Sequence, residues 1–145
     1  MALDGRRTLS GTWGQIWIDG VLVAEIKKAE FKTTVNREDI QLGIDVDSKM
    51  TGLKGEFTLT VQKTYTMYNT YVKKYNNGED LRVQIISNLK DPDAVKKQAD
   101  RWSFPNCWFN ELPLVNWEKG GVIEDELSGG FPPSLAKNLD EIKRV

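Results

Sequence analysis

The stretch Gln15-Ile16-Trp17-Ile18-Asp19-Gly20-Val21-Leu22-Val23-Ala24 says most about the fold of this chain. Both of its halves are rich in apolar, β-branched and aromatic residues, which favour strands. The Asp19-Gly20 pair between them is typical of a two-residue hairpin turn, because both turn positions require positive φ. The stretch therefore predicts two antiparallel strands, over residues 15–19 and 21–35.

The second of these strands continues past the length of its partner. Apolar residues alternate with polar ones through Phe31 and Val35, and the inward parity changes at Lys27-Lys28, which predicts a β-bulge there. Residues 36–53 then form a polar segment with isolated apolar side chains. We interpret this segment as an extended loop that contacts another copy of the chain, since a loop of this length is usually functional.

The remaining pattern is mostly that of short strands. Residues 56–63 alternate between apolar and polar, which predicts a strand. Over 64–75 the apolar spacing becomes helical; Thr64 or Thr66 is expected to cap this helix, and Asn77-Gly78 to end it. Further strands are predicted at 81–89, 101–104, 107–109 and 122–127, with an irregular one at 112–117. Gly120-Gly121 and Gly129-Gly130 are interpreted as turns.

No strand–helix–strand alternation occurs in this pattern. The sequence predicts a mainly β protein, an antiparallel β-sandwich or barrel with one flanking α-helix. We expect a single domain over residues 1–145, in which the glycine-rich residues 1–14 form an N-terminal arm.

Composition excludes several classes of function. The chain has 145 residues, of which 28% are charged, and a net charge of −1, so no overall field draws it to nucleic acid or to an anionic membrane. No apolar run approaches the roughly 20 residues that span a bilayer. No apolar segment follows Arg6-Arg7, so we expect no secretory signal. The single cysteine, Cys107, fits a reducing compartment.

Catalytic and metal sites are not expected. The chain has no histidine, which removes histidine-based triads and histidine-ligated zinc. The Asp45-to-Glu56 spacing imitates a calcium loop, but Met50 stands where that loop requires glycine. Glu124 and Glu126 have no convergent partner for glycoside hydrolysis. We therefore expect no catalytic residue, no metal and no cofactor.

Several segments, in order and spacing, resemble the tail tube proteins of PBSX-type contractile phage tails. They are residues 10–20, 25–36 and 52–63, the Tyr68-Asn69-Thr70-Tyr71 run and the Asn106-Cys107-Trp108-Phe109 run. The resemblance covers nearly the whole chain, and its specificity comes from order and length. It implies a fold like that of the type VI secretion tube protein.

The resemblance also implies a function. Proteins of this family form hexameric rings that stack into the inner tube of the tail and pass DNA without binding it specifically. The implied partners are further copies of the chain, the tail sheath protein, the tape measure protein, and the baseplate and tail-terminator proteins. The implied location is the virion tail, after assembly in the host bacterial cytoplasm. A small-ligand-binding β-barrel stays open as the alternative.

Carried onto this sequence, the resemblance places residues 15–35 and 54–63 around the ring, and residues 36–52 and 1–14 between rings. We expect apolar side chains to form the oligomer interface: Trp17, Phe31, Val35, Ile40, Leu42, Ile44, Met50 and Leu53. A conduit for DNA should repel phosphate, so acidic and hydroxyl side chains are expected to face the lumen: Glu38, Asp39, Glu56, Thr58 and Thr60.

Overall fold

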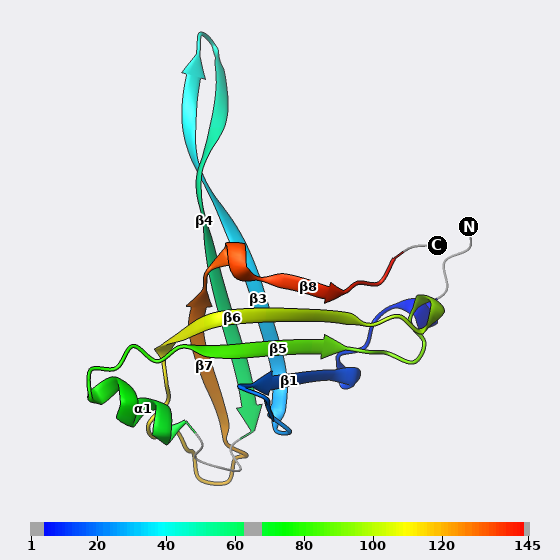
Figure 1. Ribbon diagram of the computed structural model, residues 1–145, viewed down its shortest axis with the longest axis vertical. Helices are drawn as coiled ribbons and strands as arrows, with labels where there is room; N and C mark the ends of the chain where they lie inside the picture. The colour runs from blue at the N-terminus through cyan, green and yellow to red at the C-terminus, as the bar shows by residue number, and fades with distance from the viewer. Residues whose placement is uncertain (1–4, 63–67, 144–145) are drawn as a thin grey trace.

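The computed structural model describes residues 5–62 and 68–143 and shows a mainly β protein (Figure 1). Its strands are β1 (Gly14–Ile18), β2 (Val21–Leu22), β3 (Ile26–Leu42), β4 (Asp45–Gln62), β5 (Val83–Leu89), β6 (Asp100–Glu111), β7 (Glu124–Phe131) and β8 (Lys137–Asp140). The described residues contain one α-helix, α1 (Asn69–Asn76). All strand pairs are antiparallel, so the predicted fold class is confirmed.

The strands form two layers that share β6. Their order is β2-β1-β5-β6-β7-β4-β3, and β8 also pairs with β6. Figure 1 shows β1, β5, β6 and β8 running across β3, β4 and β7. In the described part of the chain β3 pairs only with β4, so its other edge is open along the side of the molecule.

The predicted turn at the start of the chain is confirmed. Asp19 and Gly20 have φ of 49° and 81°, and Trp17 lies opposite Leu22. The strand after the turn is interrupted, because β2 has two residues and β3 begins only at Ile26. The register between β3 and β4 shifts between Ile26 and Lys28, where the bulge was predicted.

Residues 36–53 differ from the expectation of a loop. They form the far part of the β3–β4 hairpin, whose strands stay paired, with a register shift between Asn36 and Arg37, as far as Leu42 opposite Asp45 at the turn around Gly43. Figure 1 shows this part standing away from the rest of the molecule. The loop prediction was wrong because both faces of this hairpin are exposed to solvent. Its strands therefore lack the alternation of apolar and polar residues by which strands are recognised in a sequence.

Three other local predictions were wrong. Residues 112–123 contain no strand, whereas β6 runs continuously through Pro105. The chain accommodates that proline with a register shift against β5 and with Asn106 at φ 57°. Gly129-Gly130 lies inside β7 rather than in a turn, opposite Phe57 and Glu56 of β4.

The strand has glycine at positions 129 and 130 because neighbouring groups fill the space that a side chain would need. A Cβ on Gly129 would lie 1.9 Å from the Trp108 carbonyl oxygen and 2.8 Å from the Phe57 ring. A Cβ on Gly130 would lie 2.5 Å from the Trp108 indole. The Arg82 guanidinium lies over the same indole, 4.8 Å from the ring centroid. The two glycines therefore allow Trp108 to pack closely against β7.

The core lies between the two layers. In β4 the predicted alternation is confirmed, since Phe57, Leu59 and Val61 are buried while their neighbours are not. The other buried apolar residues of the core cluster are Ile16, Ile18, Val23, Tyr68, Val83, Ile85, Phe104, Cys107, Phe109, Leu127 and Phe131.

Helix α1 packs on this core by its tyrosines. The Tyr71 ring stacks on Phe109 with centroids 5.3 Å apart, and the Tyr75 hydroxyl donates to the carbonyl oxygen of Leu81. The helix ends at Asn77-Gly78, as predicted, with Gly78 at φ 83°. The predicted start of the helix, with its caps Thr64 and Thr66, lies outside the described residues.

A buried carboxylate joins the start of α1 to β7. Asp125 is fully buried, and the hydroxyl of Tyr68 donates a hydrogen bond to it. The Asn116 amide, in the loop between β6 and β7, also donates to Asp125, at 3.5 Å. Burial and the bond to Asp125 both raise the pKa of Tyr68, so its phenol remains protonated and donates.

We predict that Gly129→Ala lowers the free energy of unfolding by about 1–3 kcal/mol, because the added methyl group overpacks the contact between β6 and β7. Gly52→Ala is the matched control, since nothing lies within 4 Å of a Cβ built there. Urea denaturation of both variants measures the difference. Equal midpoints for the two variants would show that β7 has room for a side chain.

We predict that Tyr68→Phe costs about 1–3 kcal/mol of stability, because it removes a donor from a buried carboxylate. Tyr71→Phe is the control, since it keeps the ring that stacks on Phe109 and should change stability by less than about 0.5 kcal/mol. Thermal and urea unfolding test both variants. A Tyr68→Phe variant as stable as the control would contradict the role of this bond.

Candidate assembly surfaces

The open edge of β3 borders a groove of about 400 Å³ between the two layers. Its floor is aromatic: the Phe31 ring stacks on Phe104 with centroids 4.1 Å apart, and the Trp102 ring stacks on Phe104 with centroids 5.9 Å apart. Phe31 and Trp102 are only partly buried in this chain. An open strand edge beside an apolar groove is the arrangement that accepts an added strand from another chain.

The distal β3–β4 hairpin exposes most of the apolar residues that were expected at an oligomer interface. Val35, Ile40, Leu42, Ile44, Met50 and Leu53 are all exposed. Val35 and Leu53 lie directly opposite each other where the hairpin leaves the body. Because side chains alternate along a strand, Ile40 and Leu42 share the face opposite to that of Val35. The hairpin therefore presents apolar side chains on both faces.

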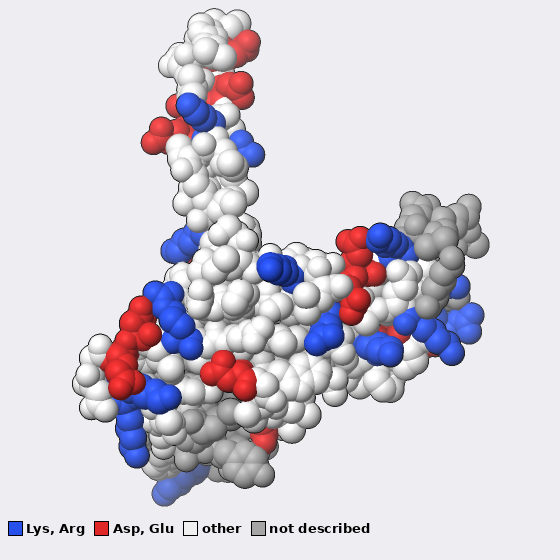
Figure 2. Space-filling model, in the orientation of Figure 1, with Lys and Arg blue, Asp and Glu red and all other residues white. Residues whose placement is uncertain are grey.

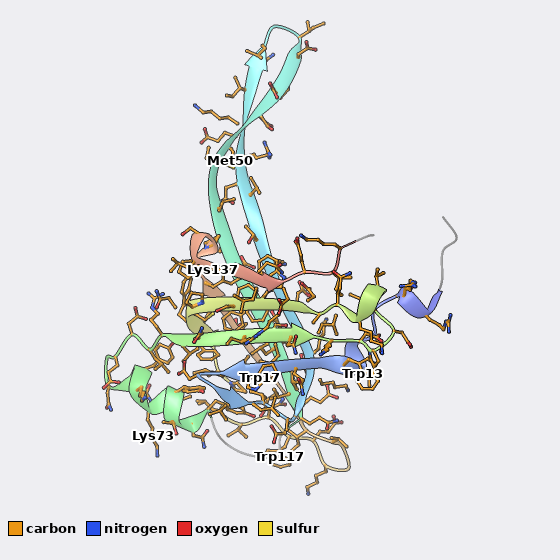
Figure 3. All side chains as sticks on the ribbon, turned by 45° about the vertical axis from the view of Figure 1, so that its right-hand side comes forward. Trp13, Trp17, Met50, Lys73, Trp117 and Lys137 are labelled. Carbon is orange, nitrogen blue, oxygen red and sulfur yellow. The ribbon has the colours of Figure 1, made fainter. Side chains whose placement is uncertain are left out.

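The other two predicted interface residues lie elsewhere. Phe31 is in the floor of the groove, and Trp17 lies on the outer face of β1, beside Ile86 and Arg101. Figure 3 shows Trp17 in the body of the molecule and Met50 on the hairpin, far from it. The eight residues thus belong to three separate surfaces.

Three of the predicted lumen residues share one surface. Glu56, Thr58 and Thr60 alternate with the buried residues of β4 and lie on its outer face, with Glu126 of β7 opposite Thr60. The Lys54 ammonium lies 3.1 Å from the Glu56 carboxylate, so basic side chains partly offset the acidic ones on this face.

Glu38 and Asp39 lie apart from that surface. Glu56 is opposite Lys32, and Glu38 is six residues further along β3, roughly 20 Å away at the rise of a β-strand. Successive strand residues point to opposite faces, so Glu38 and Asp39 do not form one acidic patch. Figure 2 shows acidic and basic side chains both placed along this hairpin.

The loop between β6 and β7 is apolar and exposed, which the sequence pattern did not predict. Residues 112–123 connect β6 to β7 and expose Leu114, Val115, Trp117 and Val122. Pro113 and Gly120-Gly121, which border these residues, were the available signal that no strand buries them. The pattern was instead interpreted as an irregular strand.

The described residues offer little for catalysis. Among them no group of three or more histidine, cysteine or carboxylate side chains is placed to hold a metal ion. Burial raises the pKa of the Cys107 thiol to about 12, and a protonated thiol is a poor nucleophile. No helix in the part of the chain that the structure describes is long and apolar enough to cross a membrane.

Among the residues that the structure describes, the cavity beside α1 is too small for a ligand. The cavity between α1 and the core, lined by Ile18, Leu59 and Tyr68 among others, has about 10 Å³, which is room for about one water molecule. The larger hollows, including the groove beside β3, open to solvent. This geometry does not support the alternative of a ligand-binding barrel.

Several solved structures have a similar fold. The chain is similar to a protein of the sheath-tube complex of the PVC extracellular contractile injection system, with a TM-score of 0.67, 8% identity, and 93% of this chain and 92% of that chain covered. It is also similar to a protein of the anti-feeding prophage cap, with a TM-score of 0.66, 10% identity, and 97% and 95% covered.

A third similar chain comes from a virion of a gene transfer agent particle, with a TM-score of 0.56, 11% identity, and 85% and 93% covered. No curated protein matches this sequence. The family model described as "Phage tail tube protein" matches residues 1–133. The chain therefore belongs to the phage tail tube protein family, and its role is that of a structural tail protein.

Proposed function

We propose that this chain assembles into hexameric rings that stack into the inner tube of a contractile tail and form the conduit for DNA ejection. The observation that carries the proposal is the open edge of β3 beside the aromatic groove, in a chain of the tail tube family. A strand from the next copy would pair with that edge and cover Phe31 and Trp102. A head-to-tail contact of this kind, repeated with closure, gives a ring.

The polar outer face of β4 is the candidate for the lumen wall. Glu56, Thr58 and Thr60 project from one face of a sheet whose opposite face is core. The lysines of this face, Lys32 and Lys54, are paired with Glu30 and Glu56, and its hydroxyl and carboxylate groups offer no cation to phosphate, so DNA would pass without being held tightly. Glu38 would line the lumen in a tube where the hairpins of neighbouring copies extend this wall. Asp39 lies on the opposite face of the strand and would face away from the lumen.

The proposed partners follow from the same assembly. The similar chains come from sheath-tube, terminator and baseplate structures of contractile systems. We propose that this chain likewise meets a sheath outside the tube, terminator and baseplate proteins at its two ends, and a tape measure protein inside it. Its place is the tail of the particle, after assembly in the host cytoplasm, and it has no catalytic role.

We predict that the purified protein at high concentration forms rings and stacked tubes. Pairing of the β3 edge satisfies exposed backbone groups and buries the aromatic groove, and both effects favour association. Negative-stain microscopy and sedimentation velocity measure the assembly. Only monomers at millimolar concentration would contradict the proposal.

We predict that Glu56→Lys leaves rings and tubes intact but slows DNA ejection, because a repeated cation on the lumen wall attracts phosphate. Glu141→Lys is the matched control, since Glu141 is an exposed acid beyond the last strand, also paired with a lysine. Ejection kinetics at two salt concentrations separate an electrostatic effect from a structural one. Ejection at the unmodified rate in the Glu56→Lys particle would count against this placement of β4.

A further inference from the structure

Both ends of the chain attach to the connection between β5 and β6, residues 90–99. At the N-terminal side, the Ser10 backbone N–H donates to Asp91 Oδ2 at 2.9 Å. At the C-terminal side, the Gln98 amide and the Lys143 backbone exchange two hydrogen bonds of 3.0 Å. Figure 1 shows the first and last described residues near this connection, on the same side of the molecule. Two polar side chains of one connection therefore hold segments from opposite ends of the sequence.

The N-terminal segment is held by hydrogen bonds more than by apolar packing. No residue of the 3₁₀ turns η1 (Gly5–Arg7) and η2 (Gly11–Trp13) is buried, and Leu9 is 41% exposed. Asp91 itself is only 4% exposed, and its second oxygen accepts from the Asp93 backbone N–H at 2.9 Å. Removing this buried carboxylate would leave both backbone donors without their acceptor. Asp91 therefore ties the N-terminal segment to the connection.

The C-terminal segment is held in a similar way. All four residues of β8 are exposed, and within the described part of the chain β8 pairs only with β6. Beyond β8, the Gln98 side chain pairs with the backbone of Lys143 as a strand residue would. The same side chain donates to the Val95 carbonyl oxygen at 2.9 Å. Because β8 buries little apolar surface, its local opening costs far less than unfolding of the core.

A series of turn hydrogen bonds links the two attachment points. The Ala94 N–H donates to the Asp91 carbonyl oxygen at 3.0 Å, and the Lys97 N–H donates to the Ala94 carbonyl oxygen at 2.8 Å. The Gln98 N–H donates to the Val95 carbonyl oxygen at 3.2 Å. Ala94 is buried, and Lys97 has a φ of 53°, which a residue other than glycine rarely adopts. The position of Gln98 thus depends on the turns that begin at Asp91.

We infer that residues 90–99 form a clasp that holds both ends of the chain and releases them together. Release of β8 would uncover the edge of β6 over residues 101–103, with which β8 pairs. Trp102 in that stretch and Ala136, just before β8, line the groove beside β3. The opened clasp would therefore add a second open strand edge to the groove, which already borders the open edge of β3.

The clasp would control assembly, and this part of the inference rests on the proposed function. In a free subunit the closed clasp covers the β6 edge with the four exposed residues of β8. A very short edge strand is one way in which proteins prevent association at the edge of a sheet. When the clasp opens, a second copy of the chain could pair with β6 as well as with β3. Each added copy would then meet two strand edges instead of one.

Amide hydrogen exchange measures whether the two ends are coupled. Asp91→Ala should raise exchange at least about fivefold in residues 5–13 and also in β8, and Gln98→Ala should do the same in both segments. Asp93→Ala is the matched control, since Asp93 is exposed and bonds to Asp91 through its backbone. The amide of Leu59 in β4, a strand paired on both sides, reports global unfolding and should stay protected.

Faster exchange at both ends in either variant supports the clasp. If Asp91→Ala loosens only residues 5–13 and Gln98→Ala loosens only β8, the two ends open independently and the inference is overturned. Should Asp91→Ala fail to fold, Gln98→Ala decides alone: unchanged exchange in residues 5–13 would overturn the inference, and faster exchange there would support it.

A reversible staple tests the consequence for assembly. Arg101 of β6 and Asp140 of β8 lie opposite each other, so Arg101→Cys/Asp140→Cys brings two sulfurs within reach of a disulfide. Cys107 is fully buried and does not compete. The oxidised variant should form tubes at least about tenfold more slowly than the same sample after reduction, because β8 can no longer leave β6. Gln15→Cys/Asn88→Cys, which staples β1 to β5, is the matched control.

The outcomes separate the clasp from the proposed function. Slow assembly of the oxidised β6–β8 staple that recovers on reduction, with no such change in the control, supports the inference. Equal rates before and after reduction overturn it and leave the tube itself standing. If the unmodified chain forms neither rings nor tubes, the proposed function fails, while hydrogen exchange still decides whether the two ends open together.

Discussion

Pairing between β3 and β4 is the constraint on which the rest of the molecule depends. The two strands stay paired from the buried body, where Phe57 faces the core, to a turn at Gly43, with a register shift between Asn36 and Arg37 on the way. Core packing holds the part of the β3–β4 pair that lies in the body. Backbone hydrogen bonds between the two strands hold the part that extends into solvent. The far part of the hairpin has no third strand and no core, so its own pairing gives only marginal stability in water.

The same pairing leaves the other side of β3 open. In a monomer that edge would invite uncontrolled pairing, and the usual protections are charge, bulges and cover. Here Lys28, Glu30 and Lys32 line the strand, and bulges interrupt it at both ends of the body. These features limit irregular association, while the aromatic groove beside the edge favours a partner that fits it. Regular self-assembly and resistance to aggregation are thus compatible in one strand.

The parts of the fold that could be predicted from sequence are those with local causes. Asp19-Gly20 needs positive φ, residues 56–62 alternate because one face is core, and Asn77-Gly78 ends a helix. The distal hairpin could not be predicted, since solvent on both faces removes the alternation. The burial of Asp125 within an acidic triplet could not be predicted either, because its partner Tyr68 is 57 residues away in the chain and Asn116 lies in an irregular loop. The candidate surfaces divide in the same way: the apolar residues at 35–53 could be recognised in the sequence, whereas the exposed apolar side chains of the β6–β7 loop could not.

The register shift between Asn36 and Arg37 has a mechanical consequence. It lies where the hairpin leaves the body, and a bulge bends the strand, so it sets the direction in which the roughly 23 Å from Asn36 to Gly43 project. Rotation by about 10° at such a bulge would displace the far end by about 4 Å, with both strands still paired. In the tube proposed above, small rotations at this shift in many copies would let the column bend while the strands of each copy stay paired.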